Sequence, residues 1–224
     1  MRARIAFALP VLLLLPVAPP VAGDLLLVGS CSGIFYALDK RTGEPLWSYD
    51  TALDGEPAEF HGDPAVLGDR VVTSCDRTSL AHTYAFRLDT GEVAWKQPRA
   101  ALFSDVAGLG RLAVGRRWNG DLIVLDSAHG DIRWSVGPSD YTYRHGPDLS
   151  PVERDGVLYF GGVDGHVYAV DGAGSDVRWS TDLHDAFTTS PATDGVDLYI
   201  GVAGHRVYRL DAATGETVWA LALP

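Results

Sequence analysis

The sequence predicts an all-β protein, and three observations support this prediction. The apolar stretches are short and end at Gly or Val, as in LLLVG (25–29), VLYFGG (157–162) and DLYIGV (197–202), which is typical of strands bounded by turns. The 224 residues include 25 Gly and 13 Pro, which favours many tight turns, and long runs at helical spacing are missing. The third observation is an internal repeat, and this repeat predicts the architecture.

Five copies of one unit follow each other when the tryptophans are set in register. The copies span residues 25–47, 70–95, 111–134, 157–179 and 197–219. Each copy ends on a tryptophan, and these are Trp47, Trp95, Trp134, Trp179 and Trp219. A period of roughly 40 residues is the size of a propeller blade.

Each copy carries the signals of four antiparallel strands. A proline such as Pro151 or Pro191 opens the first strand, where its missing N–H is harmless. Asn-Gly or Asp-Gly pairs predict tight hairpins between the second and third strands. Before the fourth strand, an Asp caps a turn and a Gly four residues later takes the left-handed conformation. The residues assigned to these turns are Asp39, Gly43, Asp126, Gly130, Asp171, Asp211 and Gly215.

Four such strands cannot bury both of their faces alone. In a radial stack each blade covers its neighbour, and the tryptophan fills the wedge between two blades. We therefore expect a β-propeller of about five four-stranded blades over residues 24–224, as a closed or an incomplete ring. Closure would need residues 19–24, since only ALALP follows Trp219. An open arc would expose a blade face and favour self-association.

Residues 1–23 have the layout of a secretory signal peptide. The basic MRAR precedes an apolar run, and the small residues Val21 and Gly23 precede Asp24. Prolines interrupt the run, which argues against a membrane anchor. We expect a periplasmic, cell-surface or secreted protein whose mature chain has no integral membrane span. PPVAGDLLLVG (19–29) also aligns with PAVLGDRVVTS (64–74), so a start within a longer propeller stays an alternative.

The net charge limits the possible binding partners, and the cysteine content bears on a possible disulfide. The formal net charge of −11 repels nucleic acid, so no nucleic-acid partner is expected. Cys31 and Cys75 are the two cysteines, and in an exported chain such a pair could form a disulfide. They fall near the ends of equivalent strands in successive repeats, so geometry leaves both the bridged and the free state open.

The stretches ALDKRTGEPLW (37–47) and RLDAATGETVW (209–219) resemble the repeat A-x-D-x-x-T-G-x-x-x-W of the pyrroloquinoline quinone (PQQ)-like propeller family. The resemblance covers residues 25–219, with Arg87 in place of the turn Asp and Ser175 in place of the turn Gly. It implies one of two classes. Quinoprotein dehydrogenases use PQQ with calcium, whereas a non-catalytic class, including the lipoprotein of the β-barrel assembly machinery, serves as a binding platform.

The sequence favours the non-catalytic class. It shows five repeats where the family's dehydrogenases usually have eight blades, and it lacks an adjacent cysteine pair. No Glu–Asn–Asp set falls on the family's calcium positions, so no cofactor is predicted, with PQQ and calcium as the alternative. A hydrolase site at the channel mouth is a further alternative. A glycosidase would need two carboxylates about 5–9.5 Å apart, but most acids here lie in the repeated turns.

The loops that lead into the first strand of each blade differ between repeats, and binding residues concentrate on such loops. Equivalent positions converge around one channel in a radial fold. We therefore predict a candidate binding site at the channel mouth, formed by His61, Arg144, His145, His184 and Asp185. The alternative is a set of solvated loop histidines. No H-x-H or HExxH spacing occurs, so no metal site is predicted.

Together these patterns predict an exported, non-catalytic propeller that is a protein-interaction scaffold or a ligand-binding or sensor module. A protein partner is expected. The alternative is an enzyme, either a reduced PQQ-dependent dehydrogenase or a channel-mouth hydrolase. The scaffold and enzyme hypotheses make different predictions for the channel. An enzyme needs converging titratable groups with perturbed pKa values there, and a scaffold needs none.

Overall fold

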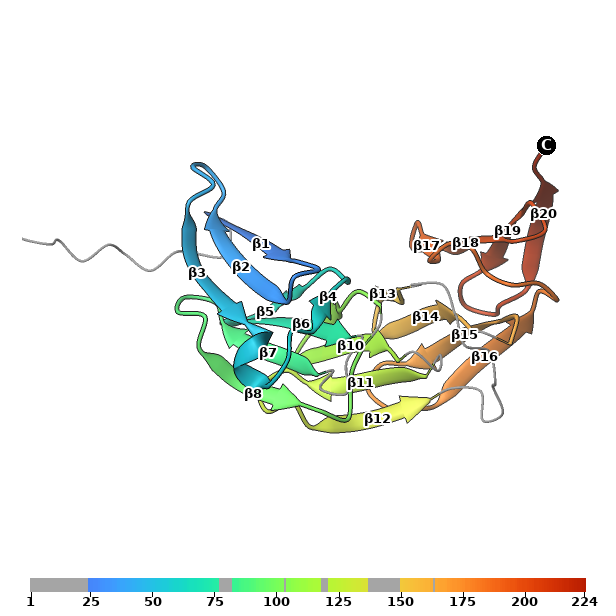
Figure 1. Cartoon of the computed structure of the whole chain (residues 1–224). Coiled ribbons are helices and arrows are strands. Elements are labelled where there is room, and N and C mark those ends of the chain that lie inside the picture. Colours follow the sequence, from blue (N-terminus) through green and yellow to red (C-terminus); the bar gives the residue numbers. More distant parts are fainter. Residues whose placement is uncertain (1–23, 77–81, 103, 118–120, 137–149, 163) are drawn as a thin grey trace, which may run out of the picture.

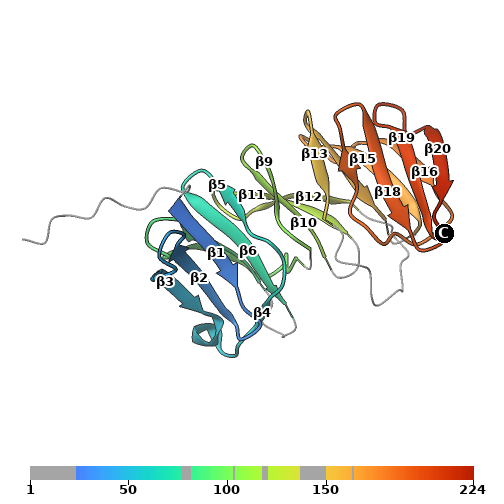
Figure 2. The same cartoon turned by 90° about the horizontal axis from the view of Figure 1, so that it is seen from above.

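A computed structural model of the chain describes residues 24–76, 82–102, 104–117, 121–136, 150–162 and 164–224. Its strands form five antiparallel sheets, which we call blades 1 to 5 in chain order. The blades follow one another along an arc, with blades 1 and 5 at its opposite ends (Figures 1 and 2). The predicted all-β class and the blade architecture are confirmed.

The strands of the five blades have the following bounds. Blade 1 contains β1 (Leu25–Gly29), β2 (Ile34–Asp39) and β3 (Pro45–Asp50), and the short 3-10 helix η2 (Thr51–Asp54) follows it. Blade 2 contains β4 (Glu59–Phe60), β5 (Ala65–Leu67), β6 (Arg70–Asp76), β7 (Thr83–Arg87) and β8 (Val93–Gln97). Blade 3 contains β9 (Ala107–Leu109), β10 (Leu112–Arg116), β11 (Leu122–Asp126) and β12 (Ile132–Val136). Blade 4 contains β13 (Val152–Arg154), β14 (Val157–Gly161), β15 (His166–Asp171) and β16 (Val177–Asp182). Blade 5 contains β17 (Ala192–Thr193), β18 (Asp197–Val202), β19 (Arg206–Asp211) and β20 (Thr217–Ala222).

Strand number departs from the expected four in two blades. Blade 1 has three strands within the described residues, and residues 19–23, which were expected to help complete it, lie outside them. Blade 2 has five, because the seven-residue β6 is long enough to pair with two short strands. Strand β5 pairs with one end of β6, while β4 pairs with the other end, where Phe60 faces Cys75.

The turn before the last strand of a blade is built around its glycine. The N–H groups of Gly43, Gly91, Gly130 and Gly215 each donate to the carbonyl four residues earlier, and these glycines have φ between 74° and 77°. In blade 4 this bond is replaced by one from Gly174 to the Asp171 carbonyl at 3.3 Å. The turn of blade 4 therefore has a different conformation, as the Ser175 substitution would lead one to expect.

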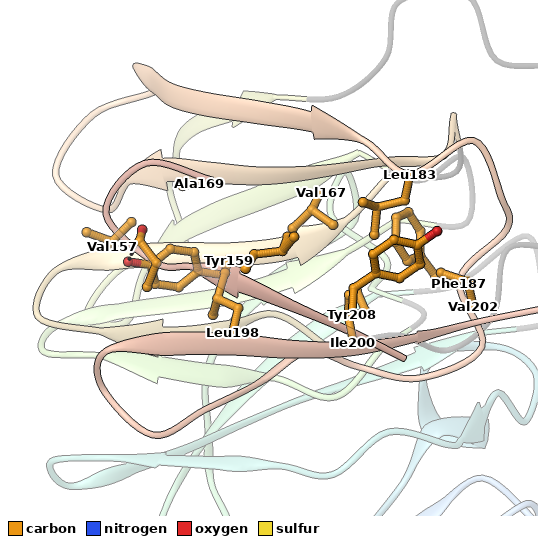
Figure 3. Close-up of a cluster of buried hydrophobic side chains, with 12 residues drawn as sticks. Val157, Tyr159, Val167, Ala169, Leu183, Phe187, Leu198, Ile200, Val202 and Tyr208 are labelled. Carbon is orange, nitrogen blue, oxygen red and sulfur yellow. Dashed lines mark hydrogen bonds between the residues drawn. The ribbon is translucent and has the colours of Figure 1, made fainter. Parts of the chain in front are cut away.

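The core lies between the blades. Each of the four buried apolar clusters among the described residues joins two successive blades. Figure 3 shows the cluster between blades 4 and 5, in which Tyr159 and Val167 of blade 4 face Leu198, Ile200 and Tyr208 of blade 5. Burial between faces of different sheets removes apolar surface from water and holds neighbouring blades together.

The blade tryptophans lie at these interfaces. A Cβ atom built on the turn glycine of the next blade would come within 2.5–2.6 Å of the indole ring of Trp47, Trp95 or Trp179. The indole N–H of each also donates to a backbone carbonyl of that blade, at 2.9–3.0 Å. These acceptors are the carbonyls of Leu88, Ser127 and Ala212.

Trp134 and Trp219 differ from these three. The Trp134 indole nitrogen is buried without a hydrogen-bond acceptor among the described residues. A groove of about 500 Å³, lined by Trp134, Arg111 and Arg133, lies beside it. Trp219 stands on the outer strand of the last blade, and 39% of its surface is exposed.

Candidate functional site

The predicted binding site is partly described. Arg144 and His145 lie outside the described residues. His61 follows β4, and its Nε2 lies 3.1 Å from a carboxylate oxygen of Glu59. His184 and Asp185 follow β16. The structure does not join His61, His184 and Asp185 in one group of metal-ligating side chains among the described residues.

His184 and Asp185 are held by nearby backbone and side-chain groups. Nδ1 of His184 lies 2.7 Å from a carboxylate oxygen of Asp182, and its positive φ of 56° turns the chain at this point. The Asp185 carboxylate accepts the N–H groups of Ala186 and Gly204, each at 2.8 Å. Asp185 therefore joins the loop between blades 4 and 5 to the β18–β19 hairpin of blade 5.

A different group gathers around His61. Ligand atoms of Cys31, Glu59 and His61 all lie within 4.8 Å of one another. Glu59 and His61 are two positions apart on an extended segment, so both point away from the buried Phe60 between them. The N–H of Phe60 donates to the Ser30 carbonyl at 3.2 Å, which brings the loop that carries Cys31 next to β4.

This group consists of side chains that bind zinc in proteins: a thiolate, a carboxylate and an imidazole. Sequence reasoning selected His61 but missed Cys31 and Glu59. The Glu-x-His spacing was the available signal, since alternation in a strand places both on one side. Cys31 could not be found this way, because only the packing of blade 1 on β4 brings it close. Cys31 and Cys75 are not joined in a disulfide; Cys31 is exposed and Cys75 is buried.

Polar groups, of which Tyr84 is buried, also meet between blades 1 and 2. The hydroxyls of Tyr49 and Tyr84 donate to the Asp54 carboxylate at 2.9 and 2.6 Å, and the Lys96 ammonium contacts its other oxygen. Burial and these bonds raise the pKa of both tyrosines. Burial alone would raise the pKa of Asp54, but the three donors outweigh it and lower that pKa. The carboxylate is thus used to join the two blades.

The carboxylates of the acidic turn residues also have hydrogen-bond and ion-pair partners. The Arg133 guanidinium and the N–H of Ala128 lower the pKa of Asp126 to about 2. Every carboxyl group with a shifted pKa in the described part of the chain is shifted downward. A general acid would need the opposite shift.

The helices in the described ranges include none that is long and apolar enough to cross a membrane.

Comparison with known proteins agrees with this architecture. A family model described as outer membrane protein assembly factor BamB matches residues 14–221. BamB of Moranella endobia is 22% identical over 90% of this chain and 66% of that protein. BamB of Shewanella oneidensis is 24% identical over 89% of this chain and 51% of that protein. The quinohemoprotein alcohol dehydrogenase ADH IIB of Pseudomonas putida is 31% identical, over 33% of this chain and 11% of that enzyme.

Solved structures show the same fold. BamB from Moraxella catarrhalis superimposes with a TM-score of 0.71 at 20% identity, covering 88% of this chain and 58% of that one. The computationally designed Ika8 protein gives 0.70 at 17% identity, covering 91% and 60%. The chain thus spans about half to two thirds of the length of the BamB relatives named above. It belongs to the PQQ-like β-propeller family of the outer membrane protein assembly factor BamB.

Proposed function

We propose that this protein is an exported, non-catalytic propeller that binds other proteins as an assembly scaffold on the periplasmic side of the outer membrane. The observation that carries the proposal is the match of the BamB family model to residues 14–221, nearly the whole chain. The similarity to the alcohol dehydrogenase covers only a third of this chain and supports the shared repeat rather than the activity. The proposal includes neither PQQ nor calcium.

The charge distribution supports a binding role over an enzymatic one. The described carboxyl groups with shifted pKa values are held ionised by backbone N–H groups or cations, and Asp54 is shared by two tyrosines and a lysine. We place the contact surface for partners on the variable loops that carry His61, Arg144, His145, His184 and Asp185, because such loops differ between blades while the strands do not.

Gene deletion in the bacterium that encodes the protein tests the scaffold role. Loss of the protein should lower the amount of folded β-barrel proteins in the outer membrane, measured by their heat-modifiable mobility on gels. A photo-crosslinking residue at His184, which is exposed, should capture a protein of the assembly machinery. The same residue at Val196, which lies in a groove between blades 4 and 5, is the control. Unchanged barrel levels together with no specific crosslink would refute the scaffold proposal.

The non-catalytic assignment has its own test. Addition of PQQ and calcium to the purified mature chain should leave the quinone absorbance unchanged and should produce no alcohol-dependent dye reduction. Tight binding of PQQ with dye reduction would assign the protein to the dehydrogenase branch instead. Export predicts that mass spectrometry of the periplasmic fraction finds Asp24 as the first residue.

A further inference from the structure

The group of Cys31, Glu59 and His61 has the spacing of a metal site. One ligand atom from each side chain lies within 4.8 Å of the other two, and Nε2 of His61 lies 3.1 Å from the Glu59 carboxylate. Zinc binds nitrogen, oxygen and sulfur ligands at about 2.0–2.3 Å, so two ligands of a tetrahedral ion are about 3.3–3.5 Å apart. The imidazole and the carboxylate are already near this separation. The Cys31 side chain is exposed, and its sulfur needs to move by at most about 1.5 Å to join them.

The buried Phe60 fixes the two blade 2 ligands against blade 1. Phe60 lies between Glu59 and His61 in the chain and is 3% exposed. Its N–H donates to the Ser30 carbonyl at 3.2 Å. A Cβ atom built on Gly29 would come 2.5 Å from the Phe60 Cβ, so the end of β1 lies closer to β4 than a residue with a side chain would allow. This packing sets the separation between the Glu-x-His pair and the turn that carries the thiol.

The turn that carries Cys31 is ordered by hydrogen bonds. Gly33 has a φ of 85°, and its N–H donates to the Ser30 carbonyl at 3.1 Å. The buried Thr51 hydroxyl donates to the Gly33 carbonyl at 2.8 Å and accepts the N–H of Ala58 at 2.9 Å. Thr51 thus joins this turn to the segment that leads into β4. Because these bonds form without a metal ion, little further ordering of the backbone is needed when an ion binds.

We propose that Cys31, Glu59 and His61 bind one Zn²⁺ ion, with water in the fourth position. A thiolate and an imidazole favour zinc over Mg²⁺ and Ca²⁺, which take oxygen ligands. Binding releases the thiol proton to the solvent. The cation then lies between a thiolate and a carboxylate, two negative groups that would otherwise repel each other.

The ion links blade 1 to blade 2, since Cys31 follows β1 and the other two ligands lie in and directly after β4. Only the folded chain brings the three ligands together, so zinc stabilises the native state. Sequence spacing did not indicate this site, because its ligands come from different blades. The inference does not rest on the scaffold role.

Titration of the purified protein with cobalt(II), with its thiols kept reduced by a phosphine, tests the ligand set. Cobalt occupies zinc sites, and its spectrum shows a charge-transfer band when a thiolate is bound and intense visible bands when the site is tetrahedral. One equivalent should produce both features, and added zinc should remove them. Cys31→Ser should abolish the charge-transfer band. His61→Gln and Glu59→Gln should raise the dissociation constant for zinc at least about 10-fold, since altering even an outer-shell partner of a zinc ligand has that effect.

Two variants are matched controls. Cys75→Ala removes the other thiol, which is buried. His129→Gln removes a histidine whose Nδ1 lies 3.3 Å from the Asp126 carboxylate, which is a similar imidazole–carboxylate pair in blade 3. Both variants should bind zinc and cobalt as the wild type does. Unfolding midpoints near that of the wild type, measured without metal, confirm that the variants fold.

Alkylation and thermal unfolding provide independent measurements. Iodoacetamide should modify the exposed Cys31 faster than the buried Cys75, and zinc should slow the reaction at Cys31, measured by peptide mass spectrometry. Zinc should also raise the melting temperature of the wild type but not that of Cys31→Ser. The proposal would be overturned by a wild type that binds no zinc, or by binding that Cys31→Ser and His61→Gln leave unchanged. Either result would leave the outcome of the deletion experiment unaffected.

Discussion

At the residue scale, the missing side chain of Gly91, Gly130 and Gly215 makes room for an indole. Gly130 and Gly43 have nearly the same backbone, with φ of 77° and 75°. They differ in what surrounds them, because Trp95 lies against Gly130 while no described residue lies within 4 Å of the Cβ position at Gly43. Comparing a substitution at Gly43 with one at Gly130 therefore separates two free-energy costs: that of a left-handed backbone and that of displacing a buried tryptophan.

Gly43→Ala should lower the free energy of unfolding by about 1–2 kcal/mol, which is the cost of the left-handed conformation for an L-residue. Gly130→Ala should cost about 1–3 kcal/mol more, because its Cβ would come 2.6 Å from the Trp95 ring. Urea unfolding of both variants measures the difference. Equal losses would contradict the role assigned to the glycine.

At the scale of the element, the fourth-strand turn depends on its glycine more than on its aspartate. Blade 2 has Arg87 in place of the aspartate, yet Gly91 still donates to the carbonyl of Arg87 at 2.9 Å. Blade 4 keeps Asp171 but has Ser175 in place of the glycine, and there the standard bond is absent. The preceding Trp134 is the tryptophan whose buried N–H has no acceptor in the described structure. The change in one turn therefore accompanies a defect at the interface between blades 3 and 4.

Ser175→Gly should allow the blade 4 turn to adopt the conformation of its neighbours and offer Trp134 an acceptor. We expect the free energy of unfolding to rise by about 0.5–1.5 kcal/mol, which is the net worth of one hydrogen bond. Urea unfolding measures the gain, and Ser180→Gly, at an exposed strand position of the same blade, is the control and should destabilise instead. A loss of stability in Ser175→Gly would show that the turn is not the cause.

At the scale of the whole molecule, stability depends on pH through the capping carboxylates. The folded protein lowers the pKa of Asp126 and Asp194 to about 2, chiefly through the Arg133 guanidinium for Asp126 and backbone N–H groups for Asp194. A carboxyl whose folded pKa lies below its unfolded value of 3.8 stabilises the fold above that value. This stabilisation is lost as the pH falls toward 2.

The melting temperature should therefore fall steeply between pH 4 and pH 2, a window set by the unfolded value of 3.8 and the folded value of about 2. Calorimetry at fixed ionic strength measures this fall. The double variant Asp126→Asn, Asp194→Asn should show a shallower decrease, because it has two fewer stabilising carboxylates to protonate. Asp155→Asn changes an exposed carboxylate and should leave the slope as it is. A slope equal in all three proteins would contradict the assignment.

The candidate site was predictable only in part. The variable loops directed attention to His61, but its partners Cys31 and Glu59 come from the loop after β1 and from β4. The expected convergence of His61 with His184 and Asp185 assumed a ring in which all loops meet. His184 pairs with Asp182, and Asp185 accepts the N–H groups of Ala186 and Gly204, while the convergence of these residues with His61 stays a prediction. Contacts between blades depend on the rotation from each sheet to the next, which sequence spacing does not specify.

By itself, the sequence determined the all-β class, the five repeated units and the glycine turns, because alternation, turn chemistry and period are local properties of the chain. Only the tertiary structure decided which tryptophans find an acceptor, that Cys31 lies beside His61, and that Asp54 joins blades 1 and 2. These outcomes depend on how one sheet packs against the next. That packing joins residues far apart in the chain.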